Sequence, residues 1–341
     1  VHMASQRVCQ MVQRRLVSSA AAERLSTSEL RSWRSTLFSK EQARQRSLYP
    51  RIEKIEVTMD APGLQGTLLV MNKGMSTPYS CARHLTEWHV SSAALALVDG
   101  EPWHMHRPLT RSCSLTLLTF KDTNPQLLNQ AYWRSCSALL GQVLDNSFKE
   151  EYSVELLKIP EVPETNPLTV NDKTCVQLAL SPSLNPLQEN MRSFTREAQQ
   201  LMLKDIPWEP LDVAPPVALE IFSHSRYKQE EVEEMAAKCP SGTVSLYRCG
   251  EHVTLSEGPL VVRTGLCYQY EVTAMHTLGE GQWGLHRRAQ GLSLPLNLTA
   301  HHTVWRKLRK RAEKLVEIPS SAATKPETTS PSPKSIPSPS Q

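Results

Sequence analysis

The sequence lacks the patterns that usually indicate metal, nucleotide or hydrolytic chemistry. Its eight cysteines are scattered, none forms a CxxC pair, and none stands at zinc-finger spacing from histidine. A P-loop GxxxxGK[ST], a nucleophile elbow GxSxG and a zincin HExxH are all missing. These absences argue against the common nucleotide-binding loops, serine hydrolases and zinc peptidases. Scattered single cysteines predict reduced, mostly buried thiols in a reducing compartment.

Long apolar runs and a strong charge of either sign are also missing. The longest apolar run, near residues 93–98, is far shorter than the roughly 20 residues that cross a bilayer, so we expect no membrane span. A net charge of +4 permits a nucleic-acid partner but does not require one. A chain of 341 residues with 40% hydrophobic content can form two modest domains with ordinary cores.

Acidic residues are nearly absent from residues 1–25, where Glu23 stands alone among four arginines and many serines and alanines. This composition is typical of a mitochondrial transit peptide, and a disordered basic tail is the alternative. Ser26 and Glu29 then form an S-x-x-E capping box that predicts a basic helix over residues 26–50, ended by Pro50. Its single apolar stripe favours docking on its own chain over docking on RNA.

Residues 51–122 have the pattern of a small α+β domain. Strands are expected at 52–58, 66–71, 95–98 and 114–120, and Asp99-Gly100 predicts a hairpin turn. Thr77 and Pro78 predict the start of a short helix between the second and third strands. Strands packed against one helix indicate a β-grasp fold.

Residues 123–300 alternate helices and strands, which predicts a larger α+β domain. Asn124 and Pro125 are expected to start a long helix that reaches about Lys149. Further helices are expected at 190–205, 216–223 and 229–238, and strands at 154–158, 176–180, 244–248, 252–255, 266–275 and 292–294. A basic helix follows at 301–316. Residues 317–341 are dense in Pro, Ser and Thr, cannot bury a core and are expected to be disordered.

Several motifs resemble two domains of threonyl-tRNA synthetases. Thr77-Pro78, the Val98-Asp99-Gly100 turn and the stretch 117–120 resemble the TGS domain. The stretches 218–222 and 244–250, Gly258-Pro259 and Thr264-Gly265 follow the order of the synthetase editing domain. The succession of both domains in one chain is more specific than any single motif. The resemblance implies a TGS domain that contacts RNA or ribosomes, followed by an editing-like domain.

The resemblance also implies which positions of this sequence match the residues that carry out editing in the family. The family's helix carries His-x-x-x-His, and its second half carries a cysteine followed by Gly-Pro-His. Arginine stays protonated, alanine and leucine offer no lone pair, and serine replaces a thiolate poorly. We therefore expect no catalytic residue, no cofactor and no metal, which is the description of a pseudoenzyme. The matching positions, all of them changed here, are Arg134, Ala138, Ser256 and Leu260.

The whole succession of segments resembles a protein family of the mitochondrial large ribosomal subunit. It implies a non-catalytic scaffold in the mitochondrial matrix that binds ribosomal RNA and neighbouring large-subunit proteins. A free-standing tRNA-binding or tRNA-editing protein is the alternative. The densest cluster of cations is the candidate RNA-binding surface, and a solvated helix face is its plainer interpretation. The candidates are Trp305, Arg306, Lys307, Arg309, Lys310, Arg311 and Lys314.

Overall fold

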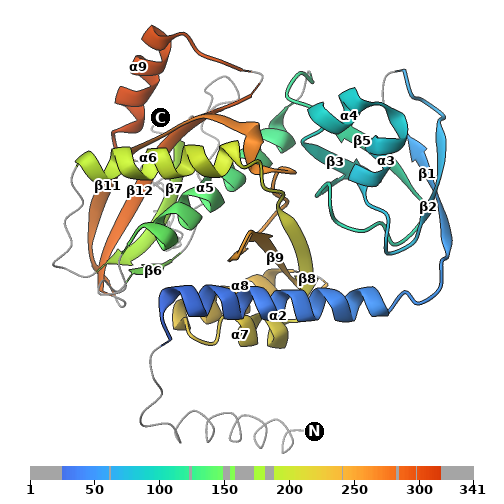
Figure 1. Ribbon diagram of the computed structural model, residues 1–341, viewed down its shortest axis with the longest axis horizontal. Coiled ribbons are helices and arrows are strands. Elements are labelled where there is room, and N and C mark those ends of the chain that lie inside the picture. The colour runs from blue at the N-terminus through green and yellow to red at the C-terminus, as the bar shows by residue number, and fades with distance from the viewer. Residues whose placement is uncertain are drawn as a thin grey trace, which may run out of the picture.

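In a computed structural model, the described part of the chain is an α+β protein with three sheets (Figure 1). The transit-like segment up to residue 24, Asn124 and the tail 317–341 lie outside the described residues. Among the described helices, none is long and apolar enough to cross a membrane. The structure describes residues 25–60, 63–122, 125–148, 154–157, 173–180, 188–239, 241–281, 284–296 and 298–315.

The basic N-terminal helix is α2, Thr27–Ser47. The predicted capping box is present, because the Ser26 hydroxyl accepts from the Glu29 N–H at 3.2 Å and the Glu29 carboxylate accepts from the Ser26 N–H at 2.8 Å. Phe38 is fully buried in a cluster with residues of a sheet far along the chain. The helix therefore docks on its own chain, as its single apolar stripe predicted.

The first sheet has the strand order β2-β1-β5-β3-β4, with β1 and β5 parallel and the other pairs antiparallel. The predicted turn joins β3 to β4, with Asp99 and Gly100 both at positive φ, as a type I′ hairpin requires. Thr77 caps α3 as expected, and Cys81 packs into the core below it. A second short helix and strand β4 were not predicted. The elements are β1 Lys54–Met59, β2 Leu68–Asn72, α3 Pro78–Leu85, α4 Glu87–Ser92, β3 Leu95–Val98, β4 Glu101–Trp103 and β5 Cys113–Leu118.

The second sheet has the order β11-β12-β7-β6 and packs against two long helices. Thirteen of the 22 residues of helix α5 are buried, so it is a central core helix rather than a surface helix with one apolar side. Strands β11 and β12 form a long antiparallel pair, well beyond the short strand predicted near residues 292–294. The elements are α5 Gln126–Ser147, β6 Val154–Leu156, β7 Lys173–Leu180, α6 Gln188–Leu203, β11 Cys267–Gly281, β12 Gly284–Pro295 and α9 His302–Ala312.

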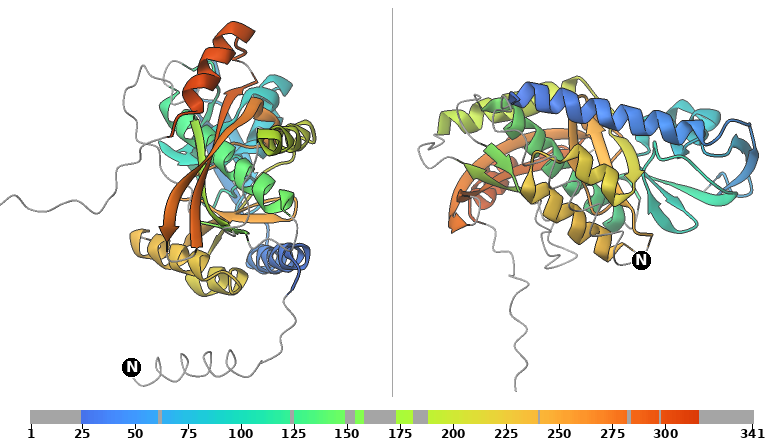
Figure 2. Two further views of the ribbon diagram at one scale, coloured as in Figure 1. Left: turned by 90° about the vertical axis from the view of Figure 1, so that its left-hand side faces the viewer. Right: turned by 90° about the horizontal axis from the view of Figure 1, so that it is seen from below.

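The third sheet, of order β10-β9-β8, is covered by α2 together with two short helices. Figure 1 shows α2 beside α7 and α8, and in the right-hand view of Figure 2 it runs along one side of the molecule. Strand β8 was not predicted. The elements are β8 Glu209–Val213, α7 Pro215–Ile221, α8 Arg226–Lys238, β9 Val244–Cys249, β10 His252–Leu255 and the 3₁₀ turn η1 Thr264–Leu266.

The segment 259–263 joins the first sheet to the rest of the chain. The Val262 N–H donates to the Ala94 carbonyl at 3.0 Å, and the Val262 carbonyl accepts from the Trp208 N–H at 3.1 Å. His104 lies against the same segment, with its Nε2 3.3 Å from the Val261 carbonyl oxygen. The His104 ring is buried, and this burial lowers its pKa to about 3.

Candidate functional site

The four positions matched to the editing site lie together, although about 120 residues separate the two stretches that hold them. Helix α5 supplies Arg134 and Ala138, and the turn after β10 supplies Ser256 and Leu260. Ala138 and Leu260 share one apolar cluster, and Arg134 lies against the turn. That these positions are remnants of an editing site stays a prediction.

Arg134 covers the glycine of the turn. A Cβ atom added to Gly258 would lie 2.7 Å from Arg134 Cζ and 2.9 Å from its Nη2, so the guanidinium sits directly on the glycine backbone. Arg134 Nε also lies 3.4 Å from the Pro259 carbonyl oxygen, at the long end of a hydrogen bond. A cation therefore lies against the turn, at a position that the resemblance matches to a histidine of the editing family.

The hydroxyl groups at the turn are engaged in its own structure. Ser256 Oγ donates to the Gly258 carbonyl at 2.7 Å. Ser135, on helix α5, accepts from the Val261 N–H at 2.8 Å and donates to the Ala131 carbonyl at 2.7 Å. These bonds fix the turn to the helix, and the Ser256 hydroxyl is directed at a carbonyl rather than at a base that could activate it.

The centre of the site is apolar and closed. Ala138, Leu260 and Trp208 are all at most 1% exposed and pack together with Tyr247 and Cys249. Burial raises the pKa of Cys249 to about 12, which keeps it a neutral thiol. Among the described residues, no group of three or more His, Cys, Asp and Glu side chains is placed to hold a metal ion. At the matched positions Arg134, Ala138 and Leu260 offer no lone pair to a metal ion or a proton.

Two residues of the site were not singled out from the sequence. Trp208 fills the centre of the cluster, and Ser135 anchors the turn. Trp208 comes directly before strand β8, which was itself not predicted, so nothing placed it near helix α5. Cys136, expected to be a buried structural thiol, is fully buried with its Sγ 3.5 Å from that of Cys267.

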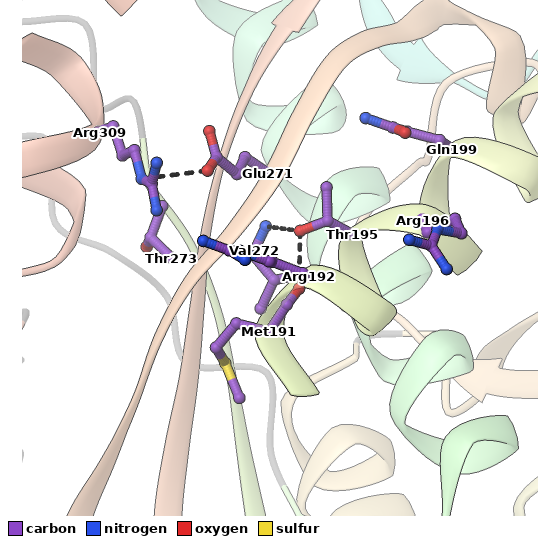
Figure 3. Close-up of a pocket in the computed structure, with 9 residues that line it drawn as sticks. All are labelled: Met191, Arg192, Thr195, Arg196, Gln199, Glu271, Val272, Thr273 and Arg309. Carbon is purple, nitrogen blue, oxygen red and sulfur yellow. Dashed lines mark hydrogen bonds and ion pairs between the residues drawn. The ribbon is translucent and has the colours of Figure 1, made fainter. Parts of the chain in front are cut away.

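The basic C-terminal helix α9 docks on β11 through part of the candidate RNA-binding set. The Trp305 indole N–H donates to Glu271 at 3.0 Å, and Arg309 Nε lies 3.0 Å from the other oxygen of the same carboxylate (Figure 3). Ala312, one turn further, is fully buried. Docking thus engages Trp305 and Arg309, and it leaves five candidates exposed: Arg306, Lys307, Lys310, Arg311 and Lys314.

The chain is similar to a ribosomal protein and to several threonine–tRNA ligases. The chain is 38% identical over 284 residues to the large ribosomal subunit protein mL39 of Drosophila melanogaster, covering 82% of this chain and 83% of that protein. It is 26% identical over 243 residues to the cytoplasmic threonine–tRNA ligase 2 of Homo sapiens and 27% over 247 residues to the probable cytoplasmic threonine–tRNA ligase 1 of Dictyostelium discoideum.

The extent of these matches separates the two groups of relatives. The ligase matches cover 70% and 71% of this chain but only 27% and 32% of the ligases. No model of a known protein family matches the chain. The mL39 match, by contrast, extends over most of both proteins at an identity well above that of the ligases. The chain therefore belongs to the family of the large ribosomal subunit protein mL39.

Proposed function

We propose that this chain is a structural, non-catalytic protein of the large subunit of the mitochondrial ribosome, working in the mitochondrial matrix. Its family supports the ribosomal role. The single structural observation that carries the non-catalytic part is the closed site, in which Leu260 and Ala138 are buried in an apolar cluster and Arg134 covers Gly258. Such a site cannot activate a water for hydrolysis.

In this proposal the domains keep the boundaries expected from the sequence. Residues 51–122 form a TGS domain of β-grasp type, and residues 123–300 form a degenerate editing domain. The mixed sheet with α3 and α4 supports the first assignment, and the position of the closed site between α5 and the turn after β10 supports the second. Residues 1–25 act as a transit peptide, and 26–50 and 301–316 are helical extensions.

The exposed face of α9 binds ribosomal RNA. Docking through Trp305, Arg309 and Ala312 turns one side of the helix inward, so the remaining cations gather on the other side. A helix face dense in lysine and arginine attracts the phosphate backbone with little dependence on base sequence. Neighbouring large-subunit proteins are the other partners.

Sedimentation tests the ribosomal role. Tagged full-length protein expressed in cells is followed through a gradient of mitochondrial lysate in high salt. We expect it to migrate with the large subunit, because an integral ribosomal protein is held by many contacts. Recovery only at the top of the gradient would contradict the proposal and would fit a loose tRNA binder.

A hydrolysis assay tests the alternative of a tRNA-editing protein. Purified chain is incubated with seryl-tRNA(Thr), with a threonyl-tRNA synthetase that carries its editing histidines as positive control. We expect seryl-tRNA(Thr) to be hydrolysed at the same rate with this protein as without any protein. Accelerated release of serine would show that the site still acts as a hydrolase.

A further inference from the structure

A second basic surface lies beside α9, in a groove at the edge of the second sheet. Helix α6 forms one wall, α9 the other, and β11 the floor (Figure 3). Side chains alternate along β11, so Tyr270 and Val272 enter the core while Glu271 and Thr273 face α9. The lining residues are Met191, Arg192, Thr195, Arg196, Gln199, Glu271, Val272, Thr273 and Arg309.

The groove carries an excess of positive charge. Arg192 and Arg196 are exposed on α6, one helical turn apart, which places their Cβ atoms about 5–6 Å from each other. Arg309 adds a third guanidinium from the opposite wall, and in Figure 3 it is joined to Glu271, while Arg196 lies on the α6 side of the groove. Glu271 pairs with Arg309, whose Nε also lies 3.3 Å from a Glu313 oxygen, so the excess of positive charge comes from Arg192 and Arg196.

The floor of the groove is rigid because its polar groups are bonded within the protein. Thr195 Oγ1 donates to the Met191 carbonyl at 2.8 Å and accepts from the Val272 N–H at 3.0 Å. Thr273 Oγ1 donates to the Ala312 carbonyl at 3.0 Å. These bonds tie α6 and α9 to the same strand, so the backbone positions that carry the arginines are held at a fixed spacing.

We propose that this groove binds the phosphate backbone of RNA, so that α6 and α9 hold one stretch of RNA between them. The inference rests on the proposed function and extends it to a site on a second helix. Arg309 lines the groove from the docked side of α9, and the exposed cations lie on the other side of the same helix, so the groove lies beside the exposed basic face. Guanidinium groups bind phosphate oxygens in a bidentate manner, and the polar lining offers little to the apolar side chains of a peptide.

The test measures RNA binding by the full chain as a function of salt. The probe is a fluorescent RNA hairpin, titrated between low and physiological concentrations of KCl and followed by anisotropy. Replacing Arg192 and Arg196 together by alanine removes two phosphate contacts. We expect binding about 10-fold weaker at physiological salt and a salt slope smaller by about 1.5. The double lysine variant at these two positions keeps the charge and should keep the slope.

A matched control and a second variant separate the groove from α9. The double variant Lys40→Ala and Arg226→Ala removes two exposed cations from helices α2 and α8 and should bind as the wild type does. The double variant Lys307→Ala and Lys310→Ala tests the exposed face of α9 alone.

The outcomes are distinguishable. If the α9 variant loses affinity while the Arg192/Arg196 variant does not, the groove proposal is wrong and the proposed function stands. If neither variant loses affinity, the assignment of both surfaces to RNA is wrong. Unchanged RNA affinity with poorer incorporation into the large subunit would also overturn the proposal, and would assign the groove to an acidic protein segment.

Discussion

The contact between Arg134 and Gly258 can be tested by adding a single methyl group. In Gly258→Ala the new Cβ would meet Arg134 Cζ at 2.7 Å, closer than real Cβ contacts come, so the guanidinium must move. The backbone of Gly258 is not in the left-handed region, so alanine itself fits there. Moving the side chain breaks the hydrogen bond between Arg134 and the Pro259 carbonyl. Because this bond is long and half-exposed, its loss should lower the free energy of unfolding by only about 1 kcal/mol.

A double-mutant cycle isolates this contact. The free energy of unfolding is measured in urea for the wild type, Gly258→Ala, Arg134→Ala and the double variant. Once Arg134 is truncated, the three atoms nearest to the added methyl group are gone, and Gly258→Ala should be neutral or stabilising by about 0.5 kcal/mol through the unfolded chain. We expect a coupling energy of about 1 kcal/mol. Additive effects within about 0.3 kcal/mol would show that Arg134 does not rest on the turn.

Substitutions at three further positions test the closed site, the contact of His104 with the segment 259–263 and the docking of α2. Leu260→Ala should lower the free energy of unfolding by about 2–5 kcal/mol and Leu260→Met by less than about 1.5, measured in urea; equal small losses would mean the cluster is open to solvent. The pKa of His104 is lower in the folded chain than in the unfolded chain, so the unfolded chain binds more protons at acidic pH. The contribution of His104 to the free energy of unfolding is therefore complete above about pH 6.5. It is lost as pH falls toward 3, by at most about 1.4 kcal/mol per pH unit. His104→Gln should flatten this part of the stability curve, and parallel curves would refute the assignment. Phe38→Ala should cost about 3–5 kcal/mol and speed amide exchange throughout α2, whereas unchanged exchange would mean the helix does not depend on this anchor.

The sequence was most informative where local chemistry decides the structure. Capping residues located the starts of α2 and α3, and Asp99-Gly100 located the β3–β4 turn, because each acts within a few residues of itself. Strand β8 escaped prediction, since its Glu-Pro-Leu-Asp-Val sequence has a proline and two acids. It becomes a strand by pairing with β9, which is a tertiary effect.

In the candidate site, too, local features could be predicted from the sequence and tertiary contacts could not. The paired positions were located only through the resemblance to the editing family, and no local pattern foretold that Trp208 would fill the space between Ala138 and Leu260. The cations of α9 were visible in the sequence, but not the side on which the helix docks. That side is set by Glu271, more than thirty residues earlier, which binds Trp305 and Arg309.

The docking of α2 also sets an order for folding. Its partners lie far along the chain: Arg248 Nη1 donates to the Ser35 carbonyl across 213 residues, and the Gln45 amide donates to the Asp212 carbonyl across 167. During synthesis the helix can form early, but its apolar stripe must wait until β8, β9 and β10 have been made. Contacts of such separation form late and slowly. A chain cut short before β8 would lack every buried partner of Phe38 in its cluster, would leave the apolar stripe of α2 exposed and would be prone to aggregate.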